Sequence, residues 1–345
     1  MKKFSRRHIL AAGTAVISAA SIGCSTSNSE SASSSSPVSS VVEKVSLVLD
    51  WTPNTNHTGI YVAEALGYFA NEGIELTIIE PATTGAESVV ASGKADFGIS
   101  FQDYLIPARL EGLPIVSVAT IMGNNTSGFA SLKSKNLTSP KAFEGKTYGG
   151  FGTELETAML KTMMEMDGGD FSKLDVVDAG AGDFLSLIQG DIDLYWIFFG
   201  WQGIQAQINE VEINTVFVSN WGVPDYYTPI IISNEDTLSQ RSEAVTKTLA
   251  AITKGYNYSI ALPDKAAEIL VASVPEIDIN VAKASQEWLS SRYVSMNATW
   301  GEQDPEVWET MSKWMAEKGL VSSVIEWDKA FSNKFLTHST TFLTD

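Results

Sequence analysis

The feature that most constrains the fold is a helix–glycine–strand plan that occurs twice in the chain. One copy reads ASGKADF and the other reads IQGDIDL. In each, an apolar helix pattern ends at a glycine, and an aspartate three residues later precedes an apolar strand pattern. Gly93 and Asp96 therefore correspond to Gly190 and Asp193. Two segments of like plan predict two lobes of like topology, each with its own sheet.

Strand and helix patterns alternate around the first copy. Residues 45–49 form an apolar run, residues 74–79 alternate, and residues 96–99 form a third strand pattern. Between them lie two helix patterns, at 62–69 and 86–91, and Gly73 ends the first. This β-α-β-α-β order is typical of an α/β fold, and it predicts a doubly wound, mostly parallel sheet flanked by helices in each lobe.

Two later helices have clear start signals. A strand pattern ends near 148–152, and Thr153 with Glu156 has the spacing of a capping box. Asp304 followed by Pro305 predicts an N-cap with proline in the first helical position. The apolar faces of the two helices carry Leu155, Met159 and Met163, and Val307, Met311 and Trp314.

The N-terminus has the pattern of an export signal. Arg6 and Arg7 precede an apolar stretch at 9–22, as in a twin-arginine signal peptide. Small residues then precede Cys24, which is typical of a lipoprotein processing site, although Ser21 departs from the usual leucine. The alternative is a short membrane anchor, but spanning needs about 20 apolar residues. We predict a signal peptide at 1–23 and a lipid on Cys24 that anchors the exported protein to the outer face of the cell membrane.

Cysteine content and charge exclude several classes of protein. Cys24 is the only cysteine, so the chain has no intramolecular disulfide and no cysteine-based metal site. Residues 25–40 are serine-rich, which predicts a flexible tether over 24–43 or a glycosylated stalk. Loss of the four positive charges in 1–23 from the formal −18 leaves −22, and such a surface repels nucleic acid.

Four loops lie where a ligand would bind. In open α/β sheets, ligands bind beyond the carboxyl ends of the strands. Segments 50–57, 100–104, 149–154 and 195–201 follow predicted strands and are rich in aromatic, amide or glycine residues. The predicted ligand-binding residues are Trp51, Asn54, His57, Gln102, Phe151, Glu154, Tyr195, Trp196, Phe199 and Tyr226.

The chemistry of these loops favours a flat, neutral or weakly cationic heterocycle. Aromatic rings stack on such ligands, and amides or a carboxylate pair with ring nitrogens. Nitrate or sulfate would require arginine. Structural roles remain open for some residues: Trp51 could belong to the core, His57 could be satisfied by backbone, and Glu156 fits a helix cap better than a ligand contact.

Three stretches resemble a known family. LDWTPNTNHTGIYVAEALGYFANEGIEL, ASGKADFGIS and GYNYSIALPDKAAEILV resemble the ABC-transporter substrate-binding proteins for thiamine pyrimidine precursors. The resemblance implies a two-lobed type II periplasmic binding protein. It also implies that Trp51, Asn54 and His57 face the 150–154 turn. The implied lobes are 44–131 plus 228–345 and 132–227.

The resemblance further implies a monomeric lipoprotein that hands its ligand to a membrane permease driven by a separate ATPase, without cofactor or metal. The YWIFFGWQG stretch is more aromatic than the pyrimidine binders lead us to expect, so riboflavin, nitrate or alkanesulfonate remain alternative ligands. A related pyrimidine synthase is the enzymatic alternative. That enzyme uses a cysteine-rich run, and this chain has only Cys24.

Overall fold

The computed structural model of the chain describes residues 42–81, 84–180, 182–295 and 299–337. The predicted signal peptide, Cys24 and nearly all of the predicted tether lie outside these residues. The first strand begins at Glu43, at the predicted end of the tether.

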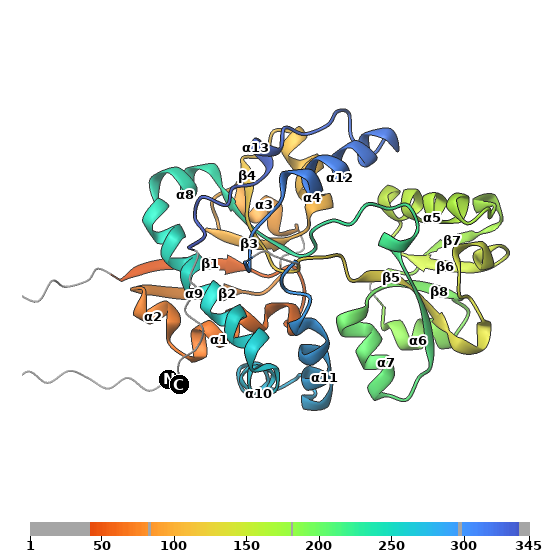
Figure 1. Cartoon of the computed structure of the whole chain (residues 1–345), viewed down its shortest axis with the longest axis horizontal. Helices are drawn as coiled ribbons and strands as arrows, with labels where there is room; N and C mark the ends of the chain where they lie inside the picture. Colours follow the sequence, from red (N-terminus) through yellow and green to blue (C-terminus); the bar gives the residue numbers. More distant parts are fainter. Residues whose placement is uncertain (1–41, 82–83, 181, 296–298, 338–345) are drawn as a thin grey trace, which may run out of the picture. The chain divides into compact units, whose positions relative to one another are not determined.

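Two five-stranded sheets form the framework, one in each lobe (Figure 1). The first sheet runs β2 (Ile74–Ile79), β1 (Glu43–Val48), β3 (Phe97–Ser100), β10 (Ile230–Asn234) and β4 (Ile115–Thr120). The second runs β7 (Asp175–Asp178), β6 (Thr147–Gly150), β8 (Leu194–Phe198), β5 (Ser127–Leu132) and β9 (Ile213–Phe217). The two-lobed α/β fold predicted from the sequence is confirmed.

The sheets are mixed, but four of the five strands in each sheet point the same way, so the prediction of mostly parallel sheets is confirmed. In the first sheet β1 pairs parallel with β2 and β3, whereas β10 runs antiparallel to β3 and β4. In the second sheet β5 has the same antiparallel role between β8 and β9. Both β10 and β5 follow a segment that crosses from the other lobe, and this entry sets their direction.

The repeated aspartates have the same structural role in the two lobes. Asp96 Oδ2 accepts a hydrogen bond from the backbone N–H of Ser46, on β1, at 2.8 Å. Asp193 Oδ2 accepts one from the backbone N–H of Thr147, on β6, at 2.9 Å. Each carboxylate therefore ties the start of its own strand to the neighbouring strand, which explains why the plan recurs.

Ten helices pack around the first sheet among the described residues: α1 (Thr58–Ala65), α2 (Tyr68–Asn71), α3 (Ala86–Ala91), α4 (Gln102–Leu110), α8 (Glu235–Gln240), α9 (Ser242–Ala261), α10 (Pro263–Ser273), α11 (Ile279–Ser290), α12 (Pro305–Glu317) and α13 (Trp327–Ala330). The second sheet carries α5 (Glu154–Met166), α6 (Phe184–Gln189) and α7 (Ile204–Ile208), with a π-helical turn, η5, at Phe199–Gly203. Figure 1 shows these two groups of helices, each around its own sheet. Short 3₁₀ turns are η1 (Thr55–His57), η2 (Lys133–Lys135), η3 (Pro140–Phe143), η4 (Phe171–Lys173) and η6 (Val218–Asn220).

The helix predicted over 62–69 is divided in the structure. It forms α1 and α2, separated at Gly67, whose φ of 70° lies in the left-handed region that ends helices. Leu66, predicted on the buried face, is 38% exposed as a result. The start signals of the later helices are confirmed, with a complete capping box of Thr153 and Glu156 on α5 and Asp304 as the N-cap of α12.

The main core of the first lobe lies between sheet and helices. Leu47, Phe97 and Ile99 from the strands are buried together with Leu249 and Tyr256 from α9. Burial of each such side chain contributes roughly 1.5–3 kcal/mol. The packing of α1 on α9 is close because glycines meet there: a Cβ on Gly255 would lie 1.9 Å from the Gly59 carbonyl oxygen.

The chain crosses between the lobes before β5 and again before β10. The crossings are joined, because Asp225 accepts hydrogen bonds from Asn125 N and from Asn124 Nδ2, both at 2.7 Å. β5 pairs only with strands of the second sheet, whereas the predicted boundary at 131–132 placed most of it in the first lobe. We propose that lobe 2 begins before β5, near residues 121–126. No helix of the described residues is both long and apolar enough to cross a membrane.

Candidate functional site

The loop after β1 is held together by its own polar side chains. The backbone N–H of Asn54 donates to His57 Nδ1 at 3.2 Å, so the proton resides on Nε2, which donates to Asp50 Oδ1 at 2.7 Å. The Asn54 side chain caps η1 through Asn56 N at 2.9 Å. His57 is fully buried, whereas Trp51 is 49% exposed. Of the three predicted residues of this loop, Trp51 is therefore the one exposed enough to contact a ligand.

The loop after β3 places Gln102 in a structural position. Its side-chain oxygen accepts from Tyr227 N at 2.8 Å, and its amide donates to Val307 O at 3.2 Å. The residue is fully buried. Both ends of the amide are thus used within the protein, and the predicted ligand contact of Gln102 stays a prediction without geometric support.

The glycine-rich turn after β6 is shaped by a buried carboxylate. Glu156 accepts hydrogen bonds from Phe151 N, Thr153 N and the Tyr148 hydroxyl, at 2.9–3.1 Å. The predicted role of Glu156 as a helix cap is confirmed. The turn presents Phe151, which is 43% exposed, and Glu154, which is also exposed.

The aromatic stretch at 195–199 divides between several environments. The Tyr195 hydroxyl is bound to Gly180 O at 2.8 Å and its ring lies 5.7 Å from Phe151. Trp196 packs between Phe129 and Phe198, and its Nε1 has no hydrogen-bond partner among the described residues. Phe199 instead contacts Trp288 of α11, with ring centroids 5.1 Å apart.

Two near-parallel rings meet where the lobes face each other. Phe101, the N-cap of α4 in the first lobe, stacks on Phe198, the last residue of β8 in the second, with centroids 6.1 Å apart and planes inclined by 14°. Tyr104 packs edge-on against Phe101 at 5.6 Å and is 49% exposed. These rings provide flat, accessible surface from both lobes.

A buried acid lies beside this ring pair. Burial, together with the charge of Glu87, raises the pKa of Asp103 to about 7, against the opposing effect of its own backbone N–H. Its Oδ1 has no hydrogen-bond partner among the described residues. Tyr226 is buried next to it, and burial and the Asp103 charge raise the tyrosine pKa. The Tyr226 hydroxyl is hydrogen-bonded to the side chains of Asn125, in the first crossing segment, and of Ser127, at the start of β5.

The field in this region is negative. Burial, Asp103, Glu87 and Glu156 raise the pKa of Tyr104 to about 12. Burial and Glu156 raise the pKa of Tyr195 to about 12. The charged groups acting on these tyrosines are thus carboxylates from both lobes. An anionic ligand would be repelled there, whereas a neutral or weakly cationic ring would be accepted.

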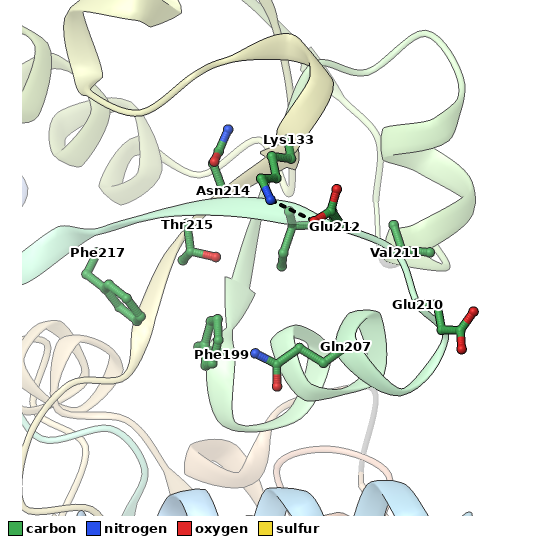
Figure 2. A pocket seen from close by; sticks show the side chains of 10 residues that line it. Lys133, Phe199, Gln207, Glu210, Val211, Glu212, Asn214, Thr215 and Phe217 are labelled. Carbon is green, nitrogen blue, oxygen red and sulfur yellow. Dashed lines mark hydrogen bonds and ion pairs between the residues drawn. The ribbon is translucent and has the colours of Figure 1, made fainter.

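A separate hollow lies on the second lobe alone. Its volume is about 570 Å³, and Figure 2 shows Phe199, Thr215 and Phe217 turned toward it, with the Lys133–Glu212 ion pair of 2.6 Å nearby. Of the predicted ligand-binding residues only Phe199 lines it. The junction of the lobes is the stronger candidate for the ligand site, because the stacked rings and the buried acid occur together there.

Comparison with known proteins identifies the family. The model described as NMT1/THI5 like matches residues 54–266. The chain belongs to the NMT1/THI5-like family. It is 30% identical over 301 residues to the formylaminopyrimidine-binding protein of Halalkalibacterium halodurans, covering 85% of this chain and 90% of that protein.

The family also contains enzymes. The chain is 28% identical over 246 residues to the 4-amino-5-hydroxymethyl-2-methylpyrimidine phosphate synthase of Legionella pneumophila, covering 70% of this chain and 77% of that enzyme. The periplasmic aliphatic sulphonate binding protein SsuA of Escherichia coli shares the fold, with a TM-score of 0.67, 12% identity, and coverage of 88% and 96% of the two chains. This NMT1/THI5-like protein therefore has the two-lobed periplasmic binding protein fold.

The ring pair and the buried acid lie in two loops that the sequence analysis selected, but these residues were not among those it predicted. Phe101, Asp103 and Tyr104 lie in the predicted loop at 100–104, from which we chose Gln102. Phe198 lies in the predicted stretch at 195–201. Acidic residues are common in the first turn of a helix, so nothing in the sequence around Asp103 indicated that its side chain is buried. No group of three metal-ligating side chains occurs within residues 42–337 as described.

Proposed function

We propose that this protein is the extracytoplasmic binding protein of an ABC importer. It binds a small aminopyrimidine, of the class from which thiamine is made, between its two lobes. The lobes close on the ligand, and the closed form docks on a membrane permease. A ligand stabilises the closed form only to the extent that it binds that form more tightly.

The stacked pair of Phe101 and Phe198 is the observation that carries this proposal. A flat ring that stacks on both phenyl faces needs roughly 7 Å between them, twice the contact distance of about 3.5 Å. The observed centroid distance is 6.1 Å. The lobes would therefore separate at this point to admit a planar ligand, which would replace a ring–ring contact by two ring–ligand contacts.

Charge favours an aminopyrimidine over an anion. Nitrate and alkanesulfonates carry a full negative charge, and Glu87, Asp103 and Glu156 act on the aromatic residues at the junction. The enzymatic alternative would need the cysteine-rich run that the resemblance associates with the synthases, and Cys24 is the chain's only cysteine. Both considerations support a binding protein for a neutral or weakly cationic ring.

Replacement of Phe198 by alanine tests whether the ligand stacks between Phe101 and Phe198. The dissociation constant for 4-amino-5-hydroxymethyl-2-methylpyrimidine, measured by isothermal titration calorimetry, is expected to rise more than tenfold. Loss of one stacking face accounts for about 0.5–1.5 kcal/mol, and the lost apolar contact area adds to it.

Phe217→Ala is the matched control, because Phe217 is a partly buried aromatic residue of the same lobe that lines the hollow of Figure 2 instead. The dissociation constant of this variant for the same pyrimidine should stay within about twofold of the wild-type value. The reverse pattern, with Phe217 sensitive and Phe198 neutral, would transfer the site to that hollow.

Export and lipidation form a separate part of the proposal. Mass spectrometry of protein extracted from the membrane of its host should show cleavage after Gly23 and a diacylglyceryl group on Cys24. A Cys24→Ala variant should accumulate unprocessed. Detection of an intact, unmodified N-terminus in the wild-type protein would refute the lipid anchor without affecting the proposed ligand.

A further inference from the structure

Asp103 is placed to act on any ring held between Phe101 and Phe198. It follows Phe101 by two residues, in the first turn of α4, and only 5% of its surface is exposed. Its Oδ1 is enclosed without a hydrogen-bond partner among the described residues. A buried acceptor without a donor destabilises the protein, so such an atom in a site calls for a donor that arrives from outside.

We propose that Asp103 recognises the edge of the ligand ring, and that this edge is an exocyclic amine next to a ring nitrogen. This inference rests on the proposed function and names the ligand feature that the site selects. The amine donates to one carboxyl oxygen, and the second oxygen and the ring nitrogen share one proton. The enclosed carboxyl becomes accessible when the lobes part to admit the ring.

The same edge explains how the site rejects other flat molecules. A pyrimidinone or a flavin carries a carbonyl oxygen where an aminopyrimidine carries the amine. The ring nitrogen beside that carbonyl carries a hydrogen and is not basic, so it cannot share a proton with Asp103 as a charge-assisted pair, and the carbonyl oxygen repels the carboxylate whenever Asp103 is ionised. Sites built on a buried polar group discriminate strongly against a ligand that leaves the group unpaired.

The shared proton makes binding depend on pH. The charged side chain that acts on Asp103 is Glu87 from α3, and the tyrosines beside it are Tyr104 and Tyr226. Glu156 reaches Tyr104 from the other lobe. Among the described residues, β4, α12 and α13 also pack on α4 but add no charged group to those acting on the carboxyl.

Between pH 7.5 and 9 the tyrosines stay protonated, because the pKa of Tyr104 is raised to about 12 and that of Tyr226 is raised as well. Asp103, with a pKa of about 7, is then largely ionised, and a weakly basic ring nitrogen is unprotonated. Formation of the complex therefore takes up one proton. The dissociation constant should rise by up to about tenfold per pH unit in this range.

The experiment compares wild type, Asp103→Asn and Asp103→Leu in the full-length protein by calorimetry. The probes are 4-amino-5-hydroxymethyl-2-methylpyrimidine and its 4-oxo analogue, at pH 7.5 and 8.5. Wild type should prefer the amine at least tenfold and lose nearly tenfold in affinity between the two pH values. Asparagine can pair with the amine edge without a proton, so Asp103→Asn should bind it within about tenfold of wild type and lack the pH effect.

Asp103→Leu should bind the amine at least tenfold more weakly than wild type and discriminate less than threefold between the probes. The same preference and the same pH effect in all three proteins would overturn the role of Asp103 and leave the proposed function standing. Failure of wild type to bind either probe would overturn both. If the leucine variant does not fold, the pH effect in the isosteric asparagine variant decides.

Discussion

Replacement of Gly255 by alanine is expected to lower the free energy of unfolding by about 3 kcal/mol or more. A Cβ at this position would lie 1.9 Å from the backbone oxygen of Gly59. Backbone atoms cannot rotate away as a side chain can, so α1 and α9 would have to separate along their contact. Overpacking of this kind typically costs 1–3 kcal/mol, and a clash with a helix backbone lies at the upper end.

The sign of this effect is informative because alanine is intrinsically favoured in helices by about 1 kcal/mol over glycine. Urea unfolding followed by circular dichroism measures the change. Lys247→Ala is the control in the same helix, since Lys247 is partly exposed and pairs with Glu243 in the preceding turn; a change within about 0.5 kcal/mol is expected there. An equal or higher unfolding midpoint for Gly255→Ala would mean that the two helices do not approach as closely as described.

Replacement of Asp103 by asparagine is expected to stabilise the ligand-free protein at pH 8 but not at pH 4. The pKa of Asp103 is about 7 in the folded protein and 3.8 for an unperturbed aspartate, so the folded state binds its proton more tightly. The contribution of the group is therefore intact below pH 4 and is lost as pH rises through 7. The loss approaches about 4 kcal/mol at full ionisation.

Unfolding by urea at pH 4, 6 and 8 tests the sign. The difference between Asp103→Asn and wild type should increase steadily with pH. Glu111→Gln removes a solvent-exposed carboxylate at the end of the same helix and serves as the control. A difference between Asp103→Asn and wild type that is the same at all three pH values would contradict the burial of an unpartnered carboxyl at this position.

Together with the ligand experiments, this result would place Asp103 in a trade-off between stability and function. A buried acceptor that lowers the stability of the free protein is retained where a ligand supplies the missing donor. The prediction is that aminopyrimidine binding removes part of the difference in stability between wild type and Asp103→Asn. In the neighbouring Gln102, by contrast, both the oxygen and the nitrogen of the side-chain amide are hydrogen-bonded within the protein.

Local signals in the sequence located several elements to the residue. The strand at 74–79 and the helix at 86–91 occupy those positions in the structure. The capping box of α5 and the Asp304 N-cap of α12 are equally local, since a cap joins residues two to three positions apart. Such features depend on the hydrogen bonds of a single turn, so neighbouring residues are sufficient to specify them.

Long-range contacts decided what the sequence pattern left open. The antiparallel direction of β5 and β10 depends on where the chain crosses between lobes. The meeting of Phe101 with Phe198 joins residues almost a hundred positions apart. The raised pKa of Asp103 depends on its burial and on Glu87, which lies on a separate helix. The periodicity of apolar residues in the sequence does not predict such long-range contacts.

The sequence by itself determined the two-lobed α/β plan, because alternation of apolar residues and the caps of helices act over a few residues. The repeated glycine and aspartate even indicated that the two lobes are built alike. Only the tertiary structure decided which side chains in those loops are free to meet a ligand. Burial and hydrogen bonding withdrew His57 and Gln102 into the framework, and the same packing left Asp103 Oδ1 without a hydrogen-bond partner among the described residues.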